Sequence, residues 1–172
     1  MRTLVSGVAP RIQRVDHVAL ALPDIAPAVP LFCDALGATF IAGGDNPLNG
    51  LRTVHLQLPG MKLELLAPIG EHSILTRGLA ERGPGLHHIT FFVDDLAATI
   101  DAWSQQGLST VGTNDSQPNW QETFLRPTDT FGALLQFVQT TRDWSTPTTE
   151  FGIDDVLAGR VQWRDHVPCL DP

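Results

Sequence analysis

Apolar residues along the chain alternate between strand-like runs and segments with helical spacing, and the same order occurs twice. In residues 15–25, VDHVALALPDI, and in residues 86–96, LHHITFFVDDL, a histidine begins an apolar run that is bounded by turn residues. Such runs are typical of buried strands. We therefore predict that a strand begins each of these two segments.

A helical segment follows each predicted strand. Apolar residues recur every three or four positions in 25–36 and again in 96–103, as they do on the buried face of an amphipathic helix. Asp24 and Asp95 precede these segments and are residues that often cap helix N-termini. Because Pro30 lies inside the first segment, we expect the first helix to be distorted or shortened.

Short strand-like pieces follow each predicted helix. The first set is ATFIAG, LRTVHLQL and MKLELLAP, and the second is LSTVG, QETFLRP and ALLQFVQ. Both halves of the chain thus have the order β-α-β-β-β, which indicates a duplicated unit. We predict an α+β fold made of two tandem βαβββ modules.

The duplication divides the chain into modules and additions. We place the first module at 14–68 and the second at 86–140, with a linker at 69–85 that holds a helix ended by its Gly-Pro-Gly. The remaining residues form an N-terminal extension, 1–13, and a C-terminal extension, 141–172.

The C-terminal extension contains apolar residues at helical spacing, namely Ile153, Val156, Leu157 and Val161. This spacing favours an amphipathic helix. We expect that helix to brace the domain or a partner subunit.

Composition narrows the class of protein. The chain has 172 residues, of which 42% are hydrophobic and 17% charged, as in a globular domain with a sizeable core. A formal net charge of −8 argues against nucleic acid or an anionic membrane as a partner. Two cysteines, no signal-peptide pattern and no run of about 18 apolar residues lead us to expect a cytoplasmic protein.

Polar residues interrupt apolar strands at matching places in the two halves. Glu64 lies 47 residues after His17, and Gln136 lies 48 residues after His88. One such histidine alone is more often a hydrogen-bonded core residue, but a buried ionised Glu is costly unless it is paired or coordinated. Together these groups suit Fe(II), Mn(II), Co(II), Ni(II) or Zn(II). We therefore predict that all four bind a divalent metal in a cavity surrounded by curved mixed sheets.

The duplicated pattern resembles the vicinal oxygen chelate superfamily, and within it the methylmalonyl-CoA epimerase branch. The stretch LLAPIGEHSILTRGLAERGPGLHHITFFVDDLAATI carries the most specific likeness, in its GLHH segment. The resemblance spans roughly residues 14–140 and implies the same four metal ligands. It also implies a homodimer and a lyase or isomerase that uses metal-stabilised enolate chemistry on a small oxygen-chelating substrate, such as an acyl thioester.

This sequence departs from the epimerase pattern at the residues that carry the chemistry. Epimerases typically have Gln at the position of Glu64 and Glu at that of Gln136, so the carboxylate here belongs to the other module. Where epimerases carry a catalytic Glu, this chain has Thr53, which is a poor base. His55 shares the strand face of Thr53 and is the nearest titratable substitute. Glu64 is a second candidate base, and Glu122 is a third that we expect to face solvent.

Three residues are candidates for contact with a substrate or ligand: Thr53, Trp120 and Arg126. Arg126, together with Arg77 and Arg82, could bind the phosphates of CoA, although the net charge of −8 counts against a CoA ester. Trp120 offers a ring for stacking, and Thr53 would line the wall of the site.

Two other functions remain open from the sequence. Two His and one carboxylate are also the ligands of non-haem Fe(II) dioxygenases, although that branch usually has its carboxylate where this chain has Gln136. The second alternative is a non-catalytic protein that binds a small molecule or confers resistance to it, which the loss of the epimerase Glu at Thr53 favours.

Overall fold

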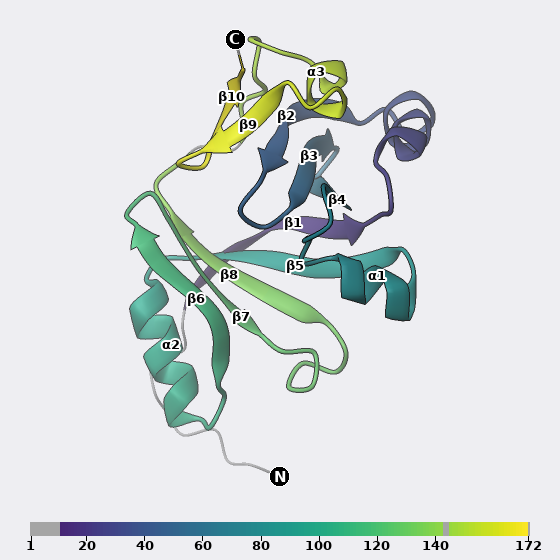
Figure 1. Ribbon diagram of the computed structural model, residues 1–172. Coiled ribbons are helices and arrows are strands. Elements are labelled where there is room, and N and C mark those ends of the chain that lie inside the picture. The colour runs from purple at the N-terminus through teal and green to yellow at the C-terminus, as the bar shows by residue number, and fades with distance from the viewer. Residues whose placement is uncertain (1–10, 143–144, 172) are drawn as a thin grey trace. The chain divides into compact units, whose positions relative to one another are not determined.

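The computed structural model describes residues 11–142 and 145–171, and the predicted order of elements occurs in it twice (Figure 1). The first set is β1 (Ile12–Ala21), η1 (Ala26–Ala28), η2 (Pro30–Ala35), β2 (Thr39–Asn46), β3 (Leu51–Leu58) and β4 (Met61–Pro68). The second set is β5 (Gly85–Val93), α2 (Leu96–Gln105), β6 (Thr110–Gln117), β7 (Trp120–Leu125) and β8 (Leu134–Thr140). The predicted α+β class is confirmed.

Three further elements are α3 (Ile153–Leu157), β9 (Val161–Arg164) and β10 (Val167–Leu170), all in the C-terminal extension. The linker forms α1 (Thr76–Arg82), which ends at Gly83 with a φ of 75°, as its glycines predicted. Most of the predicted N-terminal extension, residues 1–10, lies outside the described residues. Within the described part of the chain, no helix is long and apolar enough to cross a membrane.

The two predicted module helices differ, and prolines lie only in the first: Pro27 in its 3₁₀ turn and Pro30 at the start of its π-helical turn. Pro30 lacks a backbone N–H, and the first helical segment is a 3₁₀ turn followed by a π-helical turn that begins at this residue. The side chain of Asp24 accepts a hydrogen bond from the backbone of Ala26. The second segment is a regular α-helix, which Asp95 caps by accepting a hydrogen bond of 2.9 Å from the backbone of Ala98.

The chain forms two compact units, and each combines separate stretches of sequence. Unit 1 contains the described residues up to His17 together with His88–Arg142, and unit 2 contains Val18–His87 together with the described residues from Ser145 onward. The chain therefore passes from one unit to the other within β1, and again at the start of β5. The two compact units therefore do not coincide with the two halves of the sequence repeat.

Unit 1 contains the N-terminal half of β1 and the sheet order β5-β8-β7-β6, with β5 parallel to β8 and the other pairs antiparallel. Helix α2 packs on this sheet through Trp103, whose ring lies 4.4 Å from that of Phe137. Val93, Leu96 and Leu125 complete this buried core. The opposite face of β5 and β8 carries the polar His88, Thr90 and Gln136 beside the buried Phe92 and Val138.

Unit 2 contains the order β10-β9-β2-β3-β4, followed by the remainder of β1. Strands β3 and β4 cover the predicted segments and pair in register from Leu51↔Pro68 to Leu58↔Met61. One face of this sheet buries Val54, Leu56 and Leu65 against the helical segments. The alternation of a strand directs the residues in between, including His55 and Glu64, to the other face.

The C-terminal extension packs against unit 2, but its helix is shorter than predicted. Val161 begins β9 instead of continuing α3, because Gly159 adopts a φ of 73° and ends the helical segment. Val156 is fully buried, and its methyl groups lie 3.2 and 3.3 Å from the point where a Cβ on Gly43 would stand. The extension is therefore part of the core of unit 2.

Shortening Val156 to Ala should destabilise the protein. The variant removes two buried methyl groups beside Gly43 and leaves a cavity, so we expect the free energy of unfolding to fall by about 2 kcal/mol. Urea denaturation measures the change, with Leu48→Ala as the control because Leu48 is 95% exposed. An effect no larger than that of the control would show that the extension adds nothing to the core.

The stabilisation from Asp155 should depend on pH. Its carboxylate accepts a hydrogen bond from the Gly152 backbone and pairs with Arg160, and both contacts lower its pKa, the backbone contact most. A lowered folded-state pKa gives stability above the unfolded value that is lost as the pH falls through the folded one. Asp155→Ala should therefore lower the urea midpoint at pH 7, and less at the lowest pH at which the wild type stays folded. An equal loss at both values would contradict this.

Candidate functional site

In unit 1, β1 and β5 bring two buried histidines together. His17 and His88 are 3% and 6% exposed, and their ring centroids lie 5.6 Å apart at 69°. Two imidazoles that bind one ion at about 2.1 Å must hold their ring centres within roughly 6–7 Å of each other. This pair satisfies that condition, so both rings can reach the same ion.

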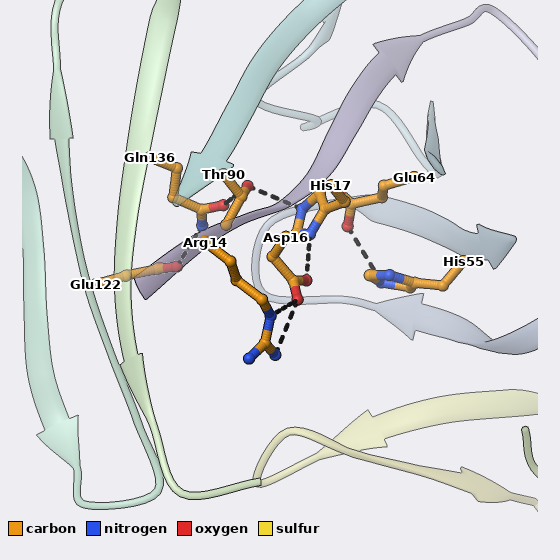
Figure 2. A network of polar contacts seen from close by, with 8 residues as sticks. All are labelled: Arg14, Asp16, His17, His55, Glu64, Thr90, Glu122 and Gln136. Atoms are coloured by element: carbon orange, nitrogen blue, oxygen red, sulfur yellow. Dashed lines mark hydrogen bonds and ion pairs between the residues drawn. The ribbon is translucent and has the colours of Figure 1, made fainter. Parts of the chain in front are cut away.

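Gln136 belongs to the same polar network. Thr90, paired with it across β5 and β8, donates its hydroxyl hydrogen to the amide oxygen Oε1 at 2.6 Å. The Thr90 oxygen also lies 2.9 Å from Nε2 of His17. The structure thus links two of the predicted ligands through a threonine, as Figure 2 shows.

Thr90 was absent from the sequence prediction, although one signal was present. It lies two residues after His88 in an apolar strand, so both side chains share a face. A polar residue at that spacing in a buried run needs a polar partner.

Asp16 is a second residue that sequence reasoning missed. Its buried carboxylate lies 3.0 Å from Nδ1 of His17 and forms an ion pair of 3.3 Å with Arg14. Arg14 in turn stands over the ring of Phe92, 4.5 Å from its centroid. A carboxylate on one imidazole nitrogen fixes the orientation of the ring. Neighbouring residues of a regular strand point to opposite faces, so strand alternation gave no reason to expect the Asp16 side chain beside that of His17.

Glu122, which we expected to face solvent, is partly buried and hydrogen-bonded. Its Oε2 accepts hydrogen bonds from Nε2 of Gln136 at 2.7 Å and from the Trp120 indole at 3.0 Å. Since a carboxylate can only accept, it fixes which end of the amide is nitrogen. Gln136 therefore turns its oxygen away from Glu122 and toward Thr90 (Figure 2).

In unit 2, His55 and Glu64 stand directly opposite each other on β3 and β4. Nε2 of His55 lies 3.3 Å from Oε1 of Glu64, and both side chains are mostly buried. Directly opposed residues of an antiparallel pair share one face, which explains the contact. Thr53 lies on the same face and accepts a hydrogen bond of 2.8 Å from the Trp163 indole.

The arginines that we considered for CoA phosphates are exposed. Arg126 follows β7, and Arg77 and Arg82 lie on α1. Arg77 pairs with Glu81 one helical turn away at 2.7 Å. Their exposure suits contact with a solvent-facing part of a ligand, not with a buried reacting group.

His87 directly precedes His88 in β5, and its surroundings lower its pKa. Burial lowers the pKa of His87, the carboxylate of Glu64 opposes that shift, and Arg82 adds to it. The neutral imidazole is therefore favoured at this position.

Comparisons with known proteins give a consistent picture. A family model described as the glyoxalase/bleomycin resistance protein/dioxygenase superfamily matches residues 16–124. An ethylmalonyl-CoA/methylmalonyl-CoA epimerase of Cereibacter sphaeroides is 35% identical over 133 residues, which cover 74% of this chain and 98% of that protein. The human mitochondrial methylmalonyl-CoA epimerase is 28% identical, over 78% of each chain.

Solved structures show the same likeness. The methylmalonyl-CoA epimerase of Mycobacterium tuberculosis superposes with a TM-score of 0.69 at 27% identity, over 80% of this chain and 94% of that one. A Streptomyces coelicolor methylmalonyl-CoA epimerase in complex with 2-nitronate-propionyl-CoA gives 0.66 at 27% identity, over 77% and 100% of the two chains.

Proposed function

Because this chain belongs to the glyoxalase/bleomycin resistance protein/dioxygenase superfamily, we propose that it is a divalent-metal-dependent isomerase of the epimerase type. Its substrate in this proposal is a small acyl thioester with an acidic α-proton, like those named for its relatives. The observation that carries the proposal is the buried network that joins His17, Thr90 and Gln136.

In this proposal His17, Glu64, His88 and Gln136 bind the metal. His17, Glu64 and His88 are buried and offer nitrogen and carboxylate ligand atoms, and Gln136 adds a neutral oxygen. Glu64 enters the set through the sequence repeat, which matches it to Gln136. This donor set suits Fe, Co, Ni, Mn or Zn in the divalent state. When bound, such an ion supplies Lewis-acid stabilisation of negative charge on substrate oxygens.

The residues around these ligands orient them. Asp16 faces Nδ1 of His17, so in this proposal Nε2 is the ligand atom, which would give up its hydrogen and its contact with the Thr90 oxygen when it binds the metal. Glu122 holds the amide nitrogen of Gln136, so that its oxygen is the atom presented. Outer contacts of this kind commonly raise metal affinity by fixing the ligand geometry.

Proton transfer in this proposal falls to His55 and Glu64. Their contact of 3.3 Å lets the pair share a proton, and an imidazole is the side chain used most often as a general base. Thr53 and Trp120 are proposed to contact the substrate. Arg126, being exposed, is proposed to meet the CoA phosphates.

Metal binding should stabilise the protein. Chelator-treated protein, purified without a chelating column, should melt about 5–10 °C higher in the presence of a suitable divalent ion at 100 times its Kd. His17→Ala and His88→Ala should each abolish the shift, whereas His72→Ala, at an exposed histidine, should keep it. No shift with any of Fe(II), Co(II), Ni(II), Mn(II) or Zn(II) would exclude the proposed site.

Catalysis should exchange the substrate α-proton with solvent. In deuterium oxide, the metal-loaded protein should label methylmalonyl-CoA or ethylmalonyl-CoA, as followed by mass spectrometry. His55→Gln should slow labelling by roughly 10²- to 10⁴-fold, because a positioned base contributes about that factor. The His72→Ala control should label at the wild-type rate.

Two results would point elsewhere. Tight binding of both esters without labelling would support a non-catalytic binding protein. Oxygen consumption with a catechol panel, without labelling, would support the Fe(II) dioxygenase.

A further inference from the structure

Trp163 reaches the sheet face of unit 2 that carries His55. It lies on β9 in the C-terminal extension, and its Nε1 donates a hydrogen bond of 2.8 Å to Oγ1 of Thr53. Its ring stands edge-on to the imidazole of His55, with 6.0 Å between the centroids and 73° between the planes. The extension thus places an aromatic side chain directly beside the proposed base.

Strand β9 joins the sheet beside β2, and Arg52 fixes β2 and the end of α3 to β3 next to it. It lies beside β2 (Figure 1) and pairs with it in parallel at Asp45↔Gln162. Arg52 forms two bonds with Asp45, at 2.7 and 2.8 Å, and donates a third to the backbone oxygen of Leu157 at 2.6 Å. The strand that carries Trp163 is therefore anchored to the same sheet as His55.

Gly44 leaves the room that Trp163 needs. A Cβ at Gly44 would lie 3.2 Å from the backbone oxygen of Val161 and 3.4 Å from Cδ1 and Nε1 of Trp163. The contact with the Val161 oxygen would be tight, and the indole atoms would be in van der Waals contact with the added Cβ, so the ring packs directly on the backbone of Gly44. The sheet is thus shaped to accept this ring.

The superfamily match does not account for this arrangement. The family model ends at residue 124, before β9 begins. The Cereibacter sphaeroides relative is matched over 98% of its length by 74% of this chain, so about a quarter of this chain lies outside that match. The contact involves a strand that the family model does not cover.

We propose that Trp163 is a positioning residue for His55, a step that rests on the proposed function of His55 as the base. The Thr53 hydroxyl anchors the indole through Nε1, and the indole edge limits rotation of the imidazole. His55 is thereby kept with Nε2 toward Glu64. Thr53, a poor base, serves as the anchor for the ring that orients the base.

Matched variants separate this role from stability. Trp163→Ala removes the ring, Trp163→Phe keeps a ring but loses the N–H, and Thr53→Val removes the acceptor at nearly constant volume. Arg164→Ala is the control, because Arg164 is the next residue of β9, points to the other face and pairs with Asp171.

The first measurement needs neither metal nor substrate. The ring signals of His55 in NMR spectra, identified by their loss in His55→Gln, should shift in Trp163→Ala and stay unchanged in Arg164→Ala. The second measurement is solvent deuterium labelling of methylmalonyl-CoA. There kcat should fall roughly 10- to 100-fold in Trp163→Ala and less in Trp163→Phe, with KM nearly constant, because misplacing a base costs rate more than binding. In Thr53→Val kcat should also fall less than in Trp163→Ala, and only kcat is compared there because Thr53 is itself proposed to contact the substrate.

The outcomes are distinguishable. Unchanged His55 signals in Trp163→Ala, or an unchanged kcat together with a normal melting temperature, would overturn the positioning role. If Trp163→Ala does not fold, Trp163→Phe and Thr53→Val decide in the same two measurements. If the wild-type protein labels no ester, the proposed function fails, and the His55 signals alone then decide whether Trp163 orients this ring.

Discussion

The hydroxyl of Thr90 holds the polar interior of unit 1 together. It is fully buried on β5, and its single hydrogen goes to Gln136, so toward His17 it can only accept. A buried polar group without a partner costs more free energy than the hydrogen bond itself contributes, so each member of the network depends on the next. The network therefore permits one arrangement of the His17 ring and one orientation of the Gln136 amide.

Unit 2 meets the same requirement with a different set of partners. The carboxylate of Glu64, buried on β4, is paired with His55 on the opposing strand. Thr53 receives its hydrogen bond from Trp163, which arrives from more than a hundred residues along the chain. At two positions where the sequence departs from the epimerase pattern, a neighbour satisfies the side chain: Glu122 accepts from the Gln136 amide, and Trp163 donates to Thr53.

The sequence predicted what depends on local pattern and missed what depends on register between distant segments. Alternating polarity located β3 and β4 with their observed bounds, and Asp95 and Pro30 behaved as their chemistry required. The contact of His17 with Thr90 depends on how β1 lies relative to β5, which periodicity does not encode. Val161 fits the helical spacing of its neighbours in the sequence. The left-handed backbone of Gly159 nevertheless ends the helical segment, and Val161 begins a strand.

The crossing of the chain from one unit to the other within β1 has a consequence for its synthesis. The residues up to His17 are synthesised before the rest of their own unit, which resumes at His88, 71 residues later, and whose last strand is β8. Until then, the segment that contains the buried Asp16 and His17 lacks its partners, and closing so long a loop makes folding slower and aggregation a greater hazard. Neither half of the repeat, released alone, would contain all the strands of either unit.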